Sequence, residues 1–519
     1  MSQTPCPNPE IVAADWHLTP PGVQQFVLEL SARLSAVVQH VTQLEAEVVR
    51  LREENAHLRE QKQSNSQNSS RPPSSDPPSG RVRPLRHRSG KHRGGQPGHR
   101  GHERQLVPVE ACAEVFAHRP TQCSTCGQAL SGDDPQPGRH QVVEIPPVKP
   151  IVTEHRLHQL ACAACGATTR APLPAEVAAT GYGPRVVATV AVLSSVLRAS
   201  QRRTQAALAD LWQVEVALGT VHTLRQEASA AVAEPVAEAT SYAQEQEVAH
   251  ADETSWVQGN ADGANPTQRT AWLWVLVTMW VTVFQVKVSR GQAAARELLG
   301  AYSGCLVTDR WSGYRWWPLE KRQVCWAHLL RDFHKIAERG DESQRIGEGL
   351  LEQARALFAL WQRVRAGTLC RAGFALAVEP IQQRVHEWLS EGAAYRPARG
   401  EKSTRARTAR TCQELLKVEL ALWLFVRVEG VEPTNNAAER ALRQAVLWRR
   451  TSFGTQSAEG SAFVARMLTV IETLRAQERN VVAYLTHACA AARQGEPAPS
   501  LLPQLSLSQA DTHSIPLAA

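Results

Sequence analysis

The sequence predicts a multidomain α+β protein, and three features of its pattern support that prediction. A sustained heptad repeat opens the chain, two Cys-x-x-Cys pairs follow it, and the second half alternates strand-like runs with helical ones. At 519 residues the chain is long enough for several such units. It contains no apolar run of the roughly 18 residues that a membrane span needs, and no signal-peptide pattern. We therefore expect a cytoplasmic protein without membrane contact.

After an irregular lead-in over 1–22, residues 23–61 carry the heptad repeat. Branched residues at position a with mostly leucine at position d favour a parallel two-stranded coiled coil, and one buried asparagine favours a single register. Position a holds Val27, Leu34, Val41, Val48 and Asn55, and position d holds Leu30, Val37, Leu44, Leu51 and Leu58. We predict a homodimer or higher oligomer through this helix. The alternative is an amphipathic helix that packs on its own domain.

Residues 62–105 are polar and proline-rich, and we predict a flexible linker that ends in a basic arm. The whole chain has a net charge of +7, and the segment from Arg81 to Arg104 has seven arginines and one lysine against one acid, so this arm holds the entire excess. Such a density of cations gives DNA affinity that depends on salt rather than on sequence. The expected DNA-binding residues are Arg81, Arg83, Arg86, Arg88, Lys91 and Arg93; a solvated linker is the alternative.

Segment 106–172 carries the two Cys-x-x-Cys pairs, each followed by glycine. Four thiolates suit a tetrahedral structural Zn²⁺ ion, and such a closed site leaves no open position for catalysis. The 35 residues between the pairs favour a zinc ribbon with a long β insertion. The predicted zinc ligands are Cys123, Cys126, Cys162 and Cys165, with His155 and His158 as competing ligands. The alternative is a small β domain with four reduced cysteines.

Segment 173–245 has helical periodicity. Pro184 suits a first helical turn, and a second helical run covers 204–211. A short connection then leads into a helix around Thr220 with the pattern of a recognition helix. We expect either a helix-turn-helix unit that contacts DNA or a plain helical connector.

A strand-rich pattern marks the predicted catalytic domain, 246–478. Strand-like runs come first, then a helical run at 292–302, then a short apolar run that ends at Asp309. Three antiparallel strands, a helix and a further strand match the order of an RNase H-like α/β domain, which places Asp252 and Asp309 on adjacent central strands. Open α/β sheets carry their chemistry at such strand ends.

A third acid, Glu439, lies 130 positions after Asp309 in a helical run. The segment between them, about 340–430, is interpreted as a helical insertion, and 479–519 as a C-terminal helix and tail. Three acids in this arrangement predict one metal site. The competing acids are Glu253, Glu429 and Glu432.

Several motifs follow one another in a fixed order along the chain. They include Gly-Gly-Gln-Pro-Gly-His in the arm, the double Cys-x-x-Cys, His-Ala-Asp-Glu-Thr, Thr-Asp-Arg-Trp-x-Gly-Tyr, Cys-Trp-Ala-His and Asn-Asn-x-Ala-Glu-Arg-Ala-Leu-Arg. Together they resemble the IS66-family insertion-sequence transposases over nearly the whole chain. The family's Asp-Asp-Glu (DDE) triad then maps onto Asp252, Asp309 and Glu439. Segment 444–450 departs from the family pattern, but the triad is intact.

The resemblance implies a DNA transposase that binds element ends and catalyses strand cleavage and strand transfer into target DNA. Two Mg²⁺ ions, or Mn²⁺ in their place, would be held by the three acids, because in-line displacement at phosphorus uses paired metal ions and magnesium prefers carboxylates. Expected phosphate contacts after the third acid are Arg443, Arg449 and Arg450. Helper proteins of the same element are candidate partners, and the protein would be nucleoid-associated. The alternative is a catalytically silent, dimeric, zinc-containing DNA-binding protein derived from a transposase.

Overall fold

The computed structural model describes residues 16, 18–63 and 104–503, so the expected DNA contacts Arg81 to Arg93 lie outside the described part. The chain divides into two compact units. The first comprises residues 1–81, 330–357 and 384–413, and the second comprises 82–329, 358–383 and 414–519. None of the helices within the described ranges is both long and apolar enough to cross a membrane.

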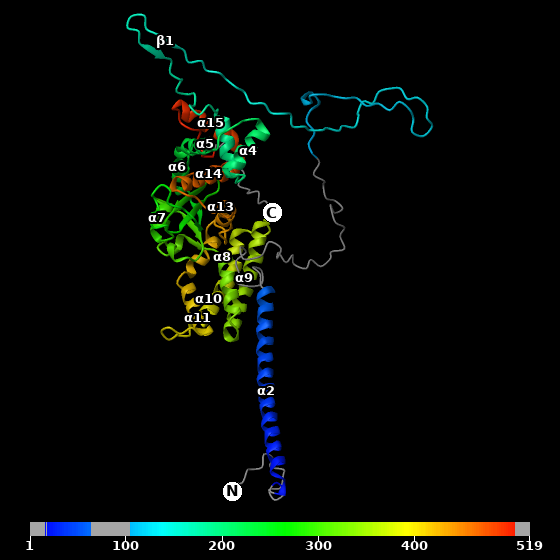
Figure 1. Ribbon diagram of the computed structural model, residues 1–519, viewed down its shortest axis with the longest axis vertical. Helices are drawn as coiled ribbons and strands as arrows, with labels where there is room; N and C mark the ends of the chain where they lie inside the picture. The colour runs from blue at the N-terminus through cyan, green and yellow to red at the C-terminus, as the bar shows by residue number, and fades with distance from the viewer. Residues whose placement is uncertain (1–15, 17, 64–103, 504–519) are drawn as a thin grey trace. The chain divides into compact units, whose positions relative to one another are not determined.

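A five-stranded mixed sheet forms the centre of the second unit (Figure 1, green). Its strand order is β5-β4-β3-β6-β7. The first three strands in sequence pair antiparallel, whereas β6 pairs parallel with β3 and β7 parallel with β6. The strands are β3 (Val248–Trp256), β4 (Ala271–Val277), β5 (Thr282–Lys287), β6 (Cys305–Thr308) and β7 (Arg322–Val324). The two strands that lead to the first two acids are therefore direct neighbours.

Helices cover this sheet, which explains why its strands are apolar on both faces. Four consecutive residues of β4, from Leu273 to Leu276, are fully buried. Helix α13 (Asn436–Ser452) packs on β3 and β4, and α14 (Ala458–Ala476) packs on β5. Hydroxyl groups of α14 also accept hydrogen bonds from the backbone of β5, from Phe284 N–H to Thr469 Oγ1 at 2.9 Å and from Thr282 N–H to Thr473 Oγ1 at 3.1 Å. The edge strand is thereby protected from pairing with another chain.

The helical segment before the sheet packs with the end of the chain. Its helices are α3 (Pro184–Ser195), α4 (Gln201–Trp212), α5 (Leu218–Ala231) and α6 (Ala233–Gln244), and α3 and α5 contact α15 (Val481–Gln494). The connection from α4 to α5 begins at Gln213, which has a left-handed backbone. Helix α5, the expected recognition helix, is joined to α15 by an ion pair between Glu227 and Arg493 at 2.7 Å. Its DNA contact stays a prediction for the exposed positions Gly219, His222 and Thr223.

The segment between the second and third acids is helical, as the sequence indicates. It contains α8 (Trp326–Ala337), α9 (Asp341–Arg365), α10 (Arg371–Ala393), α11 (Thr404–Leu416) and the short α12 (Leu424–Arg427), and α7 (Gln292–Leu299) lies before it between β5 and β6. Close packing within the first unit needs glycine: a Cβ atom at Gly349 would lie 2.3 Å from the ring of Trp388. Helices α9 and α10 therefore approach more closely there than a larger residue would allow.

One structural difference concerns the region between the two cysteine pairs. Residues 130–158, all of them described, form no strand, and the zinc segment contains only the short strands β1 (Gln159–Ala161) and β2 (Thr168–Arg170). The expected long β insertion is therefore wrong. The physical reason is the five prolines between 135 and 150, each of which removes a donor that a sheet would need.

Residues Pro21–Gln63 form one uninterrupted helix, α2, of 43 residues. The apolar heptad side chains from Leu30 to Leu51 face solvent, with Leu34 64% and Leu44 48% exposed. A row of exposed leucines and valines at this spacing is unfavourable in water and is typical of a helix that pairs with a second copy. The coiled coil itself stays a prediction.

We expect Leu34→Asp together with Leu44→Asp to convert a dimer into a monomer, because charges at heptad core positions cannot be buried without a partner. Sedimentation analysis of the full chain measures the change. Gln39→Asp, a charge outside the predicted core positions of the same helix, is the matched control and should leave the dimer intact. If both variants keep the mass of the wild type, the heptad face does not hold the copies together.

Candidate active site

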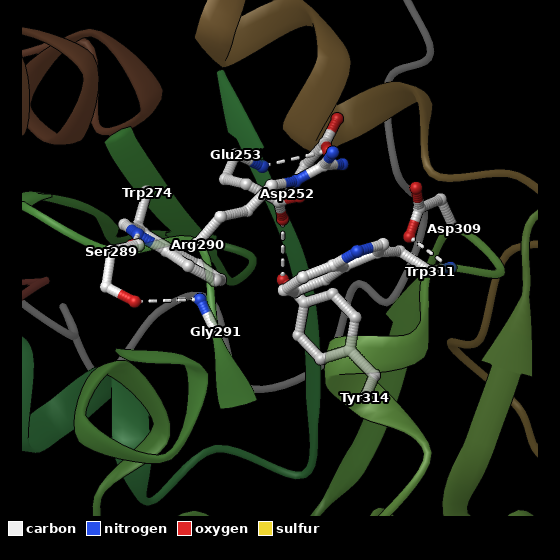
Figure 2. A network of polar contacts seen from close by, with 9 residues as sticks. All are labelled: Asp252, Glu253, Trp274, Ser289, Arg290, Gly291, Asp309, Trp311 and Tyr314. Atoms are coloured by element: carbon white, nitrogen blue, oxygen red, sulfur yellow. Dashed lines mark hydrogen bonds and ion pairs between the residues drawn. The ribbon is translucent and has the colours of Figure 1, made fainter. Parts of the chain in front are cut away.

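The sheet register places the first two predicted acids at corresponding positions on neighbouring strands. His250 of β3 is in register with Val307 of β6, so Asp252 and Asp309 each lie two positions further in the same direction. Glu439 lies in the first turn of α13, which packs on β3. Three segments that are distant in sequence therefore bring their carboxylates to one region (Figure 2 shows the first two).

The carboxylates influence one another electrostatically. The pKa of Asp252 is raised well above its usual value, first by burial, then by the negative charges of Asp309 and Glu253, and further by Glu439. Crowded, partly buried carboxylates repel one another, and a divalent cation relieves that repulsion. The donor set therefore fits magnesium, which prefers carboxylate oxygens.

Glu439 also contacts a second group of potential ligands. His328 Nδ1 lies 3.7 Å from Glu439 Oε1. Within the described ranges, Cys325, His328 and Glu439 are the one set of three such side chains whose ligand atoms all lie within 4.8 Å of one another. The triad oxygens are therefore spread more widely. Oxygens that bind a single ion, each about 2.1 Å from it, lie within about 4 Å of one another. Oxygens that bind two ions about 4 Å apart can be more widely separated.

Asn435 connects the third acid to the first. Its side chain is fully buried, and its Nδ2 donates to the carbonyl of Ala251 at 2.9 Å. Its Oδ1 lies 3.2 Å from His250 Nδ1, and its backbone N–H donates to Cys325 Sγ at 3.1 Å. Because the Ala251 carbonyl can only accept, the amide orientation is set, and His250 must carry a proton on Nδ1. Burial lowers the pKa of His250 to about 4, so this is the neutral ring.

The sequence pattern does not predict this role of Asn435. An asparagine before a helix is the ordinary N-cap signal, yet the Asn435 side chain makes no capping hydrogen bond to α13. It binds β3 instead, which fixes the start of α13, and with it Glu439, beside the strand that carries Asp252.

Glu253 lies inside a separate polar network (Figure 2). Its side chain is fully buried, and its Oε1 pairs with Arg290 Nε at 2.8 Å. The Tyr314 hydroxyl donates to its Oε2 at 3.2 Å. The Arg290 guanidinium lies 4.7 Å from the ring centres of both Trp272 and Trp311. Glu253 thus connects the loop after Asp309 to β3. To bind a metal, it would have to lose its contacts with Arg290 and Tyr314.

Arg322 of β7 holds the same loop from the other strand. Its Nη2 donates to the carbonyl of Asp309 at 2.9 Å and its Nη1 to the carbonyl of Tyr314 at 3.1 Å. The Asp309 carboxylate itself accepts the N–H of Trp311 at 2.9 Å. The backbone of the second acid is therefore held by a buried cation that sequence reasoning did not identify.

The arginines expected to hold phosphate divide into two groups. Arg443 and Arg450 are exposed on α13. Arg449 lies on the side of that helix that faces β3, where its Nη1 donates to Ser255 Oγ at 2.6 Å and to Thr254 Oγ1 at 3.2 Å. The structure therefore gives Arg449 a structural role that the sequence pattern did not indicate.

The two cysteine pairs form equivalent loops. In the first, Cys123 N–H donates to Gln128 O at 2.8 Å, and in the second Cys162 N–H donates to Ala167 O at the same distance. Gly127 and Gly166 have left-handed φ angles of 74° and 72°. Hydrogen bonds from the backbone lower the pKa of Cys123, chiefly from Cys126, and of Cys162, chiefly from Cys165. Each loop thus favours the thiolate that binds zinc, although the four sulfurs are not gathered around one point.

Comparison with known proteins identifies the family. Residues 180–462 match the model described as "Transposase IS66 family", which is more than half of the chain. The chain belongs to the IS66 transposase family. Residues 120–166 match "zinc-finger binding domain of transposase IS66", a range that contains both cysteine pairs, and residues 18–105 match a family of unknown function, DUF6444.

Two relatives of this IS66-family protein come from Sinorhizobium fredii (strain NBRC 101917 / NGR234). The uncharacterized protein y4hP is 25% identical over 413 residues, which are 74% of this chain and 71% of the relative. The uncharacterized protein y4qI is 24% identical over 271 residues, which are 48% of each chain. The family resemblance and the structural zinc domain predicted from the sequence are confirmed, whereas the roles of the three acids stay predictions.

We expect Asn435→Ala to lower the free energy of unfolding by about 1–3 kcal/mol, because it leaves the Ala251 carbonyl and the His250 ring without their buried partner. Urea titration followed by tryptophan fluorescence measures it. Asn436→Ala, which changes the exposed neighbouring asparagine, is the matched control and should alter stability by less than about 0.5 kcal/mol. Equal effects of the two substitutions would show that the buried amide has no special role.

Purified protein should contain about one zinc ion per chain, the content of a closed four-thiolate site. Cys162→Ser should remove it, whereas Cys370→Ser, at an exposed cysteine outside the two pairs, should not. Elemental analysis after gel filtration gives the ratio. Metal-free wild-type protein with an intact zinc segment would contradict the assignment of the four ligands.

Proposed function

We propose that this member of the IS66 transposase family binds insertion-sequence ends and catalyses DNA strand cleavage and strand transfer. The observation that carries the proposal is the convergence of Asp252, Asp309 and Glu439 from two neighbouring strands and a helix, close enough for the last two to raise the pKa of the first. Carboxylates crowded in this way are suited to divalent cations rather than to acid–base chemistry alone.

The fold supports an RNase H-like assignment for the catalytic domain. Three antiparallel strands are followed by a helix and two parallel strands, in the order β5-β4-β3-β6-β7. The first acid lies within the central strand and the second directly after its parallel neighbour. The third comes from a helix that packs on the central strand, after the helical insertion.

In the proposed reaction the three carboxylates would hold two Mg²⁺ ions, with Mn²⁺ as a substitute. When bound, the ions would stabilise the attacking and leaving oxygens of an in-line displacement at phosphorus. Asp252, Asp309 and Glu439 would supply the carboxylate ligands of both ions. Arg322 and the Glu253 network keep the Asp309 loop in place, and Asn435 does the same for the start of α13. The exposed arginines of α13 would hold DNA phosphates beside these acids.

The N-terminal half would bring DNA and a second copy to this site. The predicted coiled coil would pair two chains, the basic arm would contact phosphates, and the zinc domain would hold or read the element end. Helper proteins of the same element are candidate partners in the assembled complex.

The decisive experiment is a joining assay with Mg²⁺, DNA flanking the gene as donor and a supercoiled plasmid as target. We expect Asp309→Asn to abolish joined product while DNA binding stays largely unchanged, because the amide loses the charge that holds the metal. Asp210→Asn, at an exposed acid of α4, is the matched control and should join as the wild type does.

Two outcomes would contradict the proposal. Joining that survives in Asp309→Asn would show that the acids are misassigned. Wild-type protein that binds DNA but yields no product, even with the helper proteins of its element, would favour the silent DNA-binding alternative.

A further inference from the structure

Helix α13 presents one continuous face to solvent. Residues at alternating spacings of four and three lie on the same side of a helix, and those on this side are exposed: Asn436, Arg440, Arg443, Leu447 and Arg450. The opposite side, with Ala445 and Trp448, is buried against the rest of the unit. Glu439 is the only acid in the helix sequence. The face therefore carries positive charge next to the third acid.

This face ends at an unusual aromatic residue. The C-cap of α13 is Phe453, which has a left-handed backbone with φ 58° and ψ 18°, and its N–H donates to Arg449 O at 2.8 Å. Glycine is the ordinary residue in that conformation, since it has no Cβ to clash. The phenylalanine side chain is also 81% exposed. Both the backbone and the ring are thus in unfavourable positions for stability alone, and such positions are concentrated at binding and catalytic sites.

The ring is presented by a fixed backbone. Gly454 follows at φ 103°, and a Cβ atom there would lie 2.2 Å from Val257 O at the end of β3. Thr455 N–H donates to Val257 O at 2.9 Å, and the Trp256 ring N–H donates to Thr455 Oγ1 at 3.1 Å. Val257 is itself 57% exposed. The backbone directly after Phe453 is therefore anchored to the end of the strand that carries Asp252.

We propose that Phe453 stacks on an unpaired or unstacked DNA base while the arginines of α13 hold the backbone of the same strand. An exposed aromatic ring beside a row of cations matches single-stranded or distorted DNA, whose bases offer flat faces and whose phosphates offer charge. This inference rests on the proposed function, because it takes DNA as the molecule that reaches the acids.

The position of Phe453 along α13 sets the distance between the stacked base and the acids. Phe453 lies fourteen positions after Glu439 in the sequence, which is about 21 Å along the helix axis at 1.5 Å per residue. For a DNA strand that runs along α13, at about 3.4 Å per nucleotide, the stacked base would lie about six nucleotides from a phosphate at the acids. Distortion of the duplex at that distance would expose a base to the ring.

The test compares DNA binding by the full chain, carrying Asp309→Asn to prevent cleavage, to two synthetic duplexes. One is perfectly paired, and the other has an unpaired bulge that contains 2-aminopurine. We expect the parent to prefer the bulged duplex and to quench the 2-aminopurine fluorescence. Phe453→Ala should weaken binding of the bulged duplex by about 10-fold, the order expected for one lost base stack, and should abolish the quenching, with binding of the paired duplex unchanged.

Three further variants sharpen the result. Phe453→Trp should restore both the preference and the quenching, because indole also stacks on bases. Leu376→Ala removes another exposed apolar side chain, this one from α10, and should change neither. Arg450→Ala should weaken binding of both duplexes and reduce the salt dependence, since it removes a phosphate contact.

The outcomes separate this inference from the proposed function. A parent protein that binds neither duplex would overturn the proposed function. Binding of both duplexes with the bulge preference unchanged in Phe453→Ala would overturn the inference about Phe453 alone. A Phe453→Ala variant that changes the sedimenting mass instead of the DNA affinity would assign this face to a contact between copies of the chain, and would also overturn the inference.

Discussion

Mutual repulsion between acids is the constraint on which the rest of the second unit depends. Asp252, Asp309 and Glu439 come from β3, from the loop after β6 and from α13, and together with Glu253 they concentrate negative charge in a partly buried place. Such a cluster is unstable unless its backbone is held rigidly or a cation is bound. The sheet supplies the rigid frame, because the parallel register of β3 and β6 sets the first two acids at matching positions.

Three polar contacts, each made by a buried side chain, keep the remaining parts of that frame in place. Arg322 holds the carbonyl of Asp309, the Glu253–Arg290 pair holds the following loop through Tyr314 and Trp311, and Asn435 joins the start of α13 to β3. Each is a group that would be costly to leave unpaired. Together they explain how segments 57 and 130 positions apart in the sequence can present carboxylates in one arrangement.

Family membership agrees with this chemistry but does not by itself identify the reacting groups, since the two relatives from Sinorhizobium fredii are uncharacterized. In the zinc domain, too, the family match and the structure give different parts of the description. The family model covers both cysteine pairs, and the structure forms the two loops separately, with backbone hydrogen bonds already directed at Cys123 and Cys162. Metal binding would then join two local structures, as thiolate sites do when the ion couples distant loops.

The sequence by itself determined the strands of the central sheet, the helices, the cysteine loops and the candidate acids, because each depends on local periodicity or on residue chemistry at short spacing. The strand pattern around Asp252 and Asp309 and the helix around Glu439 could therefore be predicted. The sequence did not determine the region between the cysteine pairs, where the predicted β insertion is wrong. Only the tertiary structure decided that Arg449 binds β3, that Arg322 holds the Asp309 backbone and that Asn435 bonds to β3 rather than capping its helix. Those roles arise from packing between segments that are remote in sequence. A local sequence pattern cannot predict which remote group will be the partner in a hydrogen bond.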